Sequence, residues 1–169
     1  LTVNMVIASS TKLTDKVNQL NKEKWKEDHL LTANISNNLA FLYEKFGKYE
    51  KSAQLLTEAY WFARKAYPEF CFDLDVHYYS PLINFLAKHK MYDVSVAFLE
   101  KCYDDIVGKE GYDSKFAFTV LAEKADIYTR IGQYALAVDS WKYLYKITRS
   151  MSEQQIIDKS LSNYSPLYI

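Results

Sequence analysis

A short helical pattern occurs three times along this chain of 169 residues, at a nearly fixed spacing. Its clearest marker is a tyrosine, found at Tyr49, Tyr92 and Tyr134, so that successive copies lie 43 and then 42 residues apart. Three further positions keep their character at the same register: a small residue (Ser52, Ser95, Ala137), a large apolar residue after it (Leu56, Leu99, Trp141) and an apolar residue in the first helix (Tyr43, Leu86, Tyr128). Self-similarity at a period of this size predicts a solenoid, in which each unit buries its apolar face against its neighbours.

The first copy, residues 37–66, is typical of two helices joined by a tight turn. Leu39, Tyr43 and Phe46 recur at three- and four-residue steps, which places them on one face of a helix. Gly47 follows, and glycine can take the positive φ with which many helices end. Helical spacing resumes at Tyr49, so the short turn predicts an antiparallel pair. We expect the small residues of this pair to let the two backbones approach closely: Ala40, Ser52 and Ala59.

The residues of the first copy resemble those of a known family. They follow the pattern L-A-x-L-Y-x-x-x-G-x-Y, with a small residue and an alanine later: Leu39, Ala40, Tyr43, Gly47, Tyr49 and Ala59. This pattern resembles the tetratricopeptide repeat, and the period most resembles the 42-residue variant found in kinesin light chains and many bacterial regulators. In the later copies Lys90 stands at the turn glycine, Ile83 at a small residue and Lys124 at a leucine. The resemblance implies an all-α fold, a right-handed α-solenoid of antiparallel helix pairs with about three full repeats plus flanking helices.

We expect a single domain over residues 1–169. Its parts are a partial leading repeat, three full repeats and a terminal helix, at residues 1–26, 28–66, 75–107, 114–149 and 150–162. In the leading part, one helix is expected from Thr11 to about Lys24 and the next from Asp28. Because the chain begins with Leu1 and no signal-like segment leads it, we also expect a fragment of a longer protein.

Composition narrows the class of protein further. Four glycines and three prolines suit helices and disfavour a β-sandwich. The 21 basic and 21 acidic residues balance without a basic block, which argues against a nucleic-acid partner. No apolar run of about eighteen residues occurs, so no membrane insertion is expected. The sequence leaves the compartment open, with the cytoplasm favoured.

No pattern in the chain predicts catalysis or a cofactor. Cys71 and Cys102 lie 31 residues apart without a C-x-x-C pair, so neither zinc nor a disulfide framework is indicated; Cys102 stands at a small core position. The alternation of Cys71, Asp73, Asp75 and His77 could suggest a metal site. Alternation gathers side chains only on a strand, whereas a helix is expected to begin here, so we interpret Asp73 or Asp75 as its cap. In the absence of a nucleophile, H-E-x-x-H or phosphate-loop motif, we predict that the protein is not an enzyme.

The family resemblance adds a binding surface. In tetratricopeptide arrays the first helix of each repeat lines the concave face. By register, this predicts an inward-facing, peptide-binding set: Asn34, Asn37, Asn38, Phe41, Lys45, His77, Asn84, Lys88, Thr119, Asp126 and Arg130. An asparagine amide can both donate to and accept from an extended peptide backbone. Asn38 matches the asparagine of the kinesin-like repeats, and Pro81 and Glu123 take its place later.

Three members of this set share a register and a positive charge: Lys45, Lys88 and Arg130. They form either a basic edge that favours acidic peptides or the ordinary solvated end of each helix. The clamp of lysines, asparagines and arginine that holds chaperone C-termini in other arrays is not evident. Its positions are occupied by Phe41, Thr119 and Glu123.

Two classes of function are compatible with these residues. The first is a protein- or peptide-binding scaffold that uses the concave face. The alternative is a ligand-sensing or dimerising regulatory domain, excised from a larger sensor kinase or transcription regulator. In that case self-association through the terminal helices is expected, because an uncapped array exposes an apolar face.

Overall fold

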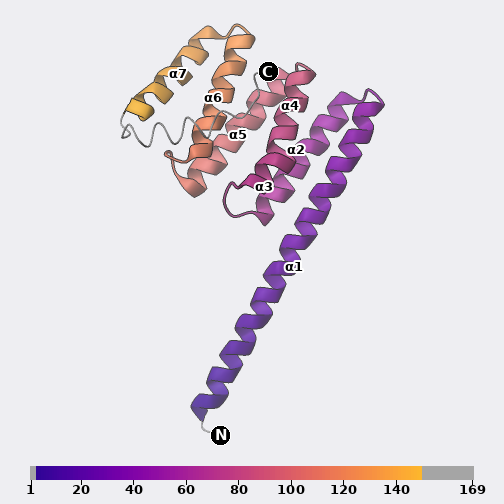
Figure 1. Ribbon diagram of the computed structural model, residues 1–169, viewed down its shortest axis with the longest axis vertical. Coiled ribbons are helices and arrows are strands. Elements are labelled where there is room, and N and C mark those ends of the chain that lie inside the picture. Colours follow the sequence, from indigo (N-terminus) through magenta and orange to yellow (C-terminus); the bar gives the residue numbers. More distant parts are fainter. Residues whose placement is uncertain (1–2, 150–169) are drawn as a thin grey trace. The chain divides into compact units, whose positions relative to one another are not determined.

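The structure, a computed structural model, describes the backbone of residues 3–149 and most of the side chains of residues 16–149 (Figure 1). Its helices are α1 (Val3–Lys45), α2 (Tyr49–Ala66), α3 (Phe72–Leu74), the π-helix η1 (Asp75–Tyr79), α4 (Ser80–Lys88), α5 (Tyr92–Glu110), α6 (Lys115–Arg130) and α7 (Tyr134–Arg149). No strand occurs in this part of the chain, so the predicted all-α class is confirmed. The terminal helix expected at 150–162 lies outside the described residues.

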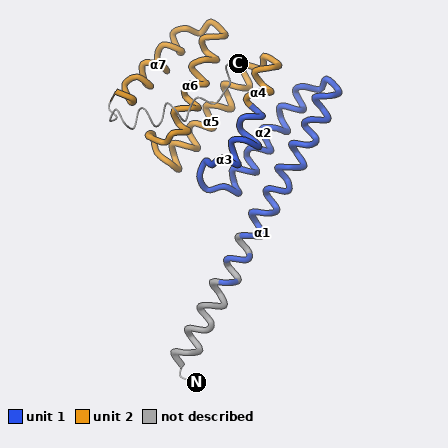
Figure 2. Tube along the Cα trace, viewed as in Figure 1, with its two compact units in different colours: residues 1–82 blue, residues 83–169 orange. Residues whose placement is uncertain are grey.

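The chain groups into two compact units, residues 1–82 and residues 83–169, with the boundary inside α4 (Figure 2). The first unit contains α1, α2, α3 and η1. The second contains the end of α4 together with α5, α6 and α7. The prediction of a single domain and of its repeat boundaries stays a prediction, and we describe each unit by itself.

Helix α1 is longer than the sequence led us to expect. One helix was expected to end near Lys24 and another to begin at Asp28, but α1 is unbroken over 43 residues. The physical reason is local: the stretch from Lys24 to Asp28 holds no glycine or proline, and its lysines and glutamate favour helix. At about 1.5 Å per residue, α1 is more than twice as long as its partner α2. Figure 1 accordingly shows α1 extending past the end of α2.

Small residues bring α1 and α2 together, as predicted. Ala40 on α1 and Ser52 and Ala59 on α2 are all buried. The Ser52 hydroxyl donates a hydrogen bond of 2.8 Å to the Ala40 carbonyl, which is possible only where two helix backbones lie close. The close approach expected from the sequence is therefore confirmed for this pair.

The three helix pairs end their first helix with the same turn. In each pair, a backbone N–H donates a hydrogen bond of 2.9 Å to the carbonyl five residues earlier. The donors and acceptors are Lys48 and Tyr43, Met91 and Leu86, and Gln133 and Tyr128. This is the Schellman arrangement, which needs one residue at positive φ. That residue is Gly47 (φ 69°), Lys90 (φ 55°) or Gly132 (φ 78°). Lys90 thus adopts the glycine conformation although it carries a side chain.

A π-helical turn explains why the spacing changes from 43 to 42 residues. The continuous helical stretch from Phe72 to Lys88 is one residue longer than α6, which has 16 residues. A single π-turn is the usual way for a helix to accommodate one extra residue, and η1 supplies it. Neither Asp73 nor Asp75 caps this helix as expected, because the helix begins earlier, at Phe72, and both aspartates lie within it. The Asp75 carboxylate instead accepts a hydrogen bond of 2.6 Å from the Ser80 hydroxyl.

The second unit has its core between α6 and its neighbours. Phe118 and Leu121 of α6 and Leu144 of α7 form a buried cluster, against which Tyr103 packs. Cys102 on α5 is fully buried, as its register predicted. In unit 2, α6 therefore packs against both α5 and α7.

Candidate binding surface

One face of α1 presents four of the predicted binding residues side by side. Asn34, Asn38, Phe41 and Lys45 follow one another at steps of four, three and four, which aligns them along a helix. All four are exposed, and the Lys45 ammonium lies 4.9 Å from the centre of the Phe41 ring. A cation over an aromatic face is a modest attraction that orders both side chains. This face therefore combines amides, an aromatic ring and a positive charge.

Two asparagines of the set hold α1 to η1. The Tyr78 hydroxyl donates a hydrogen bond of 2.8 Å to Asn34 Oδ1. Asn37 Nδ2 donates one of 3.0 Å to the backbone carbonyl of His77. The Oδ1 of Asn37 is buried and has no hydrogen-bond partner among the described residues. Since its donor is engaged and its acceptor is covered, the Asn37 amide positions the next helix rather than presenting itself to a ligand.

The Tyr78 hydroxyl keeps its proton at every physiological pH. Burial raises the pKa of Tyr78 above its ordinary value, and the neighbouring Tyr67 raises it further. A neutral phenol can donate, so the bond to Asn34 persists across that range. The contact between α1 and η1 is thus insensitive to pH changes near neutrality.

The side chains around His77 do not gather into a metal site. His77 is exposed, with its ring 6.4 Å from that of Tyr78 and nearly perpendicular to it. The Asp75 carboxylate is engaged by Ser80. Within the described residues, no group of three or more potential metal ligands comes together.

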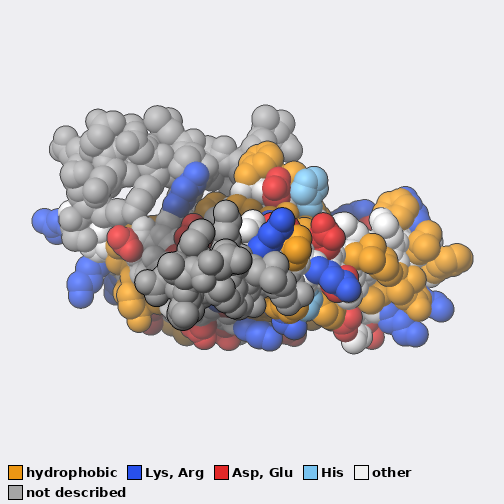
Figure 3. All heavy atoms as spheres, turned by 90° about the horizontal axis from the view of Figure 1, so that it is seen from below, with side chains coloured by type: hydrophobic (Ala, Val, Ile, Leu, Met, Phe, Trp, Pro, Cys, Tyr) orange, Lys and Arg blue, Asp and Glu red, His pale blue; other side chains and the backbone are white. Residues whose placement is uncertain are grey.

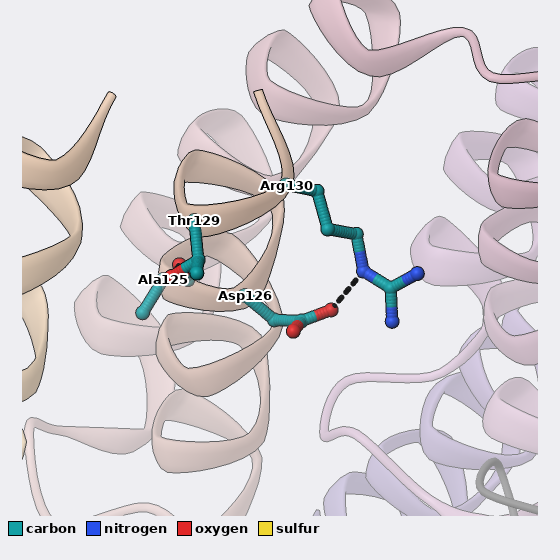
Figure 4. Close-up of polar contacts among 4 residues, drawn as sticks. All are labelled: Ala125, Asp126, Thr129 and Arg130. Atoms are coloured by element: carbon teal, nitrogen blue, oxygen red, sulfur yellow. Dashed lines mark hydrogen bonds and ion pairs between the residues drawn. The ribbon is translucent and has the colours of Figure 1, made fainter. Parts of the chain in front are cut away.

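Unit 2 contributes the remaining predicted residues on two helices. Asn84 and Lys88 are exposed one turn apart on α4. On α6, the Arg130 Nε and an Asp126 carboxylate oxygen lie 2.6 Å apart, and the two residues are one turn apart along the helix (Figure 4). Such an exposed pair stabilises the helix by only a few tenths of a kcal/mol. In Figure 4 the two terminal nitrogens of Arg130 point away from Asp126.

The three residues of the basic register occupy equivalent helix ends. Each lies in the last turn of its helix: Lys45 in α1, Lys88 in α4 and Arg130 in α6. A cation is favourable there because the carbonyl ends of the helix carry partial negative charge. This environment accounts for the recurring charge without a ligand, so the preference for acidic peptides stays a prediction.

Sequence reasoning missed Tyr78 and the turn that places it. Tyr78 is buried in η1, and its partner Asn34 lies 44 residues earlier in the chain. The only signal in the sequence was the extra residue of the first period, which indicates an insertion without saying where it lies.

With this geometry in place, we compared the chain with known proteins. No family model and no curated protein matches the sequence. No helix in the described part is long and apolar enough to cross a membrane.

Proposed function

We propose that this protein is a non-enzymatic scaffold that binds an extended segment of another protein along the first helices of a tetratricopeptide-like solenoid. The observation that carries the proposal is the recurrence of one turn at the repeat spacing. Lys90 adopts the same positive φ as Gly47 and Gly132, so the turn recurs even where the sequence lacks glycine. A feature that persists without its usual residue supports a common architecture for the three pairs.

The face of α1 supports the binding part of the proposal. Asn38 is exposed on α1 beside Phe41 and Lys45, and α2 packs on a different face of α1. An amide that can both donate and accept suits a peptide backbone, and a ring with a nearby cation suits a side chain next to it. Asn34 and Asn37 hold α1 against η1, so the surface is ordered before a ligand arrives, which lowers the entropic cost of binding.

The test is selection of ligands from a library of random short peptides displayed on phage. We expect peptides that bind the parent protein to bind an Asn38→Ala, Asn84→Ala variant roughly thirtyfold more weakly, because it loses two amide contacts. Each lost amide contact costs about 1 kcal/mol, and roughly 1.4 kcal/mol corresponds to a factor of ten. The matched control is Gln54→Ala, which removes an exposed amide from the second helix α2.

The control variant should bind as the parent does. Both variants must first show the parent's helicity and melting temperature. If the Asn38→Ala, Asn84→Ala variant bound the selected peptides as tightly as the parent, the first helices would not be the binding surface, and the proposal would be wrong.

The regulatory-domain alternative has one observation in its favour. Large apolar side chains are exposed on α1 and on α7, at the two ends of the described chain. A regulatory domain that works by self-association needs such surfaces.

A further inference from the structure

Helix α1 exposes a line of apolar side chains that we call the α1 stripe. It consists of Leu31, Ile35, Leu39, Leu42 and Phe46, which recur at three- and four-residue steps and are 40 to 77% exposed. Ala33 and Ala40, which are fully buried, lie on another face of α1. The α1 stripe therefore faces away from the helix partner that the structure gives to α1.

The same register is covered in the later first helices. Tyr78 and Leu82 stand 43 residues after Ile35 and Leu39, and both are buried; Tyr78 lies in η1, which packs on α2, and Leu82 lies in α4. Val120, 42 residues after Tyr78, is buried in α6, which packs on α5. This face of a first helix is thus buried where another helix pair precedes it. On α1 that place is exposed.

Helix α7 exposes the complementary face, which we call the α7 stripe. It consists of Tyr134, Val138, Trp141 and Tyr145, spaced by four, three and four residues and 47 to 65% exposed. At three of the four equivalent positions of α2, Ala53, Leu56 and Tyr60 are at most 9% exposed, whereas Tyr49, the counterpart of Tyr134, is 43% exposed. Tyr60 meets the ring of Tyr79 in η1, with their centres 6.1 Å apart. This face of a second helix is therefore the one that receives the next first helix.

We propose that the α7 stripe of one molecule packs on the α1 stripe of a second copy of this chain, head to tail. The contact would repeat between molecules the packing that α2 makes on α3 and η1, and that α5 makes on α6. The two faces are unlike, so a pair of molecules leaves one α1 stripe and one α7 stripe unoccupied, and further copies can add there. This inference goes beyond the binding of a peptide and does not depend on it.

The chain's own last residues are a poor occupant of the α7 stripe. Phe116 and Val120 supply the apolar face of α6 at the start of that helix. One period of 42 residues later stand Asp158 and Ser162, so the repeat register does not continue an apolar face there. The α1 stripe, by contrast, is apolar at all five of its positions. A second copy therefore fits the α7 stripe better than residues 150–169 do.

The area of the two stripes sets the expected strength of the association between copies. A half-exposed residue of this size has about 100 Å² of accessible surface, so each stripe can bury roughly 400 to 500 Å² in a contact. A standard stable interface buries about 800 Å² per partner, so the contact belongs to the weak, concentration-dependent class. Figure 3 shows, on the face it presents, exposed hydrophobic side chains interspersed with charges of both signs. Charges beside the apolar groups limit non-specific clustering.

The experiment uses two variants that each block one stripe, Ile35→Asp and Trp141→Asp. Both positions are exposed, so neither substitution disturbs a packed core. In sedimentation velocity over a wide range of concentration, the parent should grow beyond a dimer as concentration rises. Each variant alone should remain monomeric, with its dissociation constant raised at least tenfold.

An equimolar mixture of the two variants gives the decisive reading. Ile35→Asp keeps its α7 stripe and Trp141→Asp keeps its α1 stripe, so the mixture should form a complex of two chains and stop there. The controls Gln54→Asp and Ala135→Asp add the same charge at exposed positions outside both stripes and should associate like the parent.

Three results would overturn the proposal. A parent that stays monomeric at every concentration would show that the stripes are covered within one chain. Dimerisation of Trp141→Asp by itself would indicate pairing of α1 with α1. Dimerisation of Ile35→Asp by itself would indicate pairing of α7 with α7.

Discussion

Replacing Lys90 by glycine should stabilise the second unit. Lys90 lies in the turn between α4 and α5 at a φ of 55°, in the left-handed region that side chains other than glycine rarely adopt. The turn itself is well formed, with the N–H of Lys90 donating to Ala87 at 3.1 Å and that of Met91 to Leu86 at 2.9 Å. The strain at Lys90 is therefore local to its own backbone.

Two opposing effects set the size of the stability change in Lys90→Gly. A residue with a Cβ loses roughly 1–2 kcal/mol in the left-handed conformation, and glycine removes that cost. Glycine also has more freedom to lose on folding, which costs about 0.5–1 kcal/mol. The net expectation for Lys90→Gly is a stabilisation of about 0.5–1 kcal/mol. Gly132→Ala should show the opposite sign, because an added Cβ meets nothing within 4 Å and only the φ of 78° opposes it.

The measurement is the midpoint of thermal and urea unfolding for Lys90→Gly, Lys90→Ala and the parent. For a chain of this length, the expected gain raises the melting temperature by about 1–4 °C. Lys90→Ala keeps the Cβ and removes only the charged stem, so it should melt like the parent. Equal stabilisation by glycine and alanine would refute the backbone argument and assign the effect to the lysine side chain.

Three further predictions follow from single contacts. Ser52→Ala should lower the free energy of unfolding by about 1 kcal/mol, because it removes the buried hydrogen bond between α2 and α1. Ser95→Ala should lower it by less, because the Ser95 hydroxyl donates only to the Met91 carbonyl one turn earlier. Urea unfolding of the two variants and the parent measures the difference. Tyr78→Phe removes the hydrogen bond from η1 to α1 and should lower the local stability of that contact by up to about 1 kcal/mol. Amide hydrogen exchange should then be faster in α1 and η1 and unchanged in α6 and α7. Burial, followed by the hydrogen bond with Tyr143, raises the pKa of Tyr103 above its ordinary value of 10.0. The stabilisation from the neutral Tyr103 phenol is therefore complete below pH 10 and is lost as the pH rises above it. Tyr103→Phe should flatten the fall in the urea midpoint between about pH 10 and pH 12.

The sequence predicted those features that depend on neighbours along the chain. The helix pairs follow from three- and four-residue steps, and the burial of Ala40, Ser52 and Cys102 follows from their register. It could not predict that α1 is continuous, because the expected break rested on a family pattern and not on a residue that stops a helix. Trp141 shows a second limit. It shares its register with the buried Leu99, yet it is half exposed, so the repeat register alone does not determine which copy of a position is buried.

The candidate surface shows the same division between local pattern and distant contact. Asn37 and Asn38 are adjacent and chemically identical, so no sequence pattern separates their roles. Successive helix residues are about 100° apart, however, and this rotation turns Asn37 towards η1 and leaves Asn38 exposed. Contact with the His77 carbonyl, 40 residues away, decides which amide is structural. It follows that Asn38 can be altered to test binding while Asn37 keeps α1 in place, so that a loss of affinity in the Asn38 variant reports on the ligand and not on the fold.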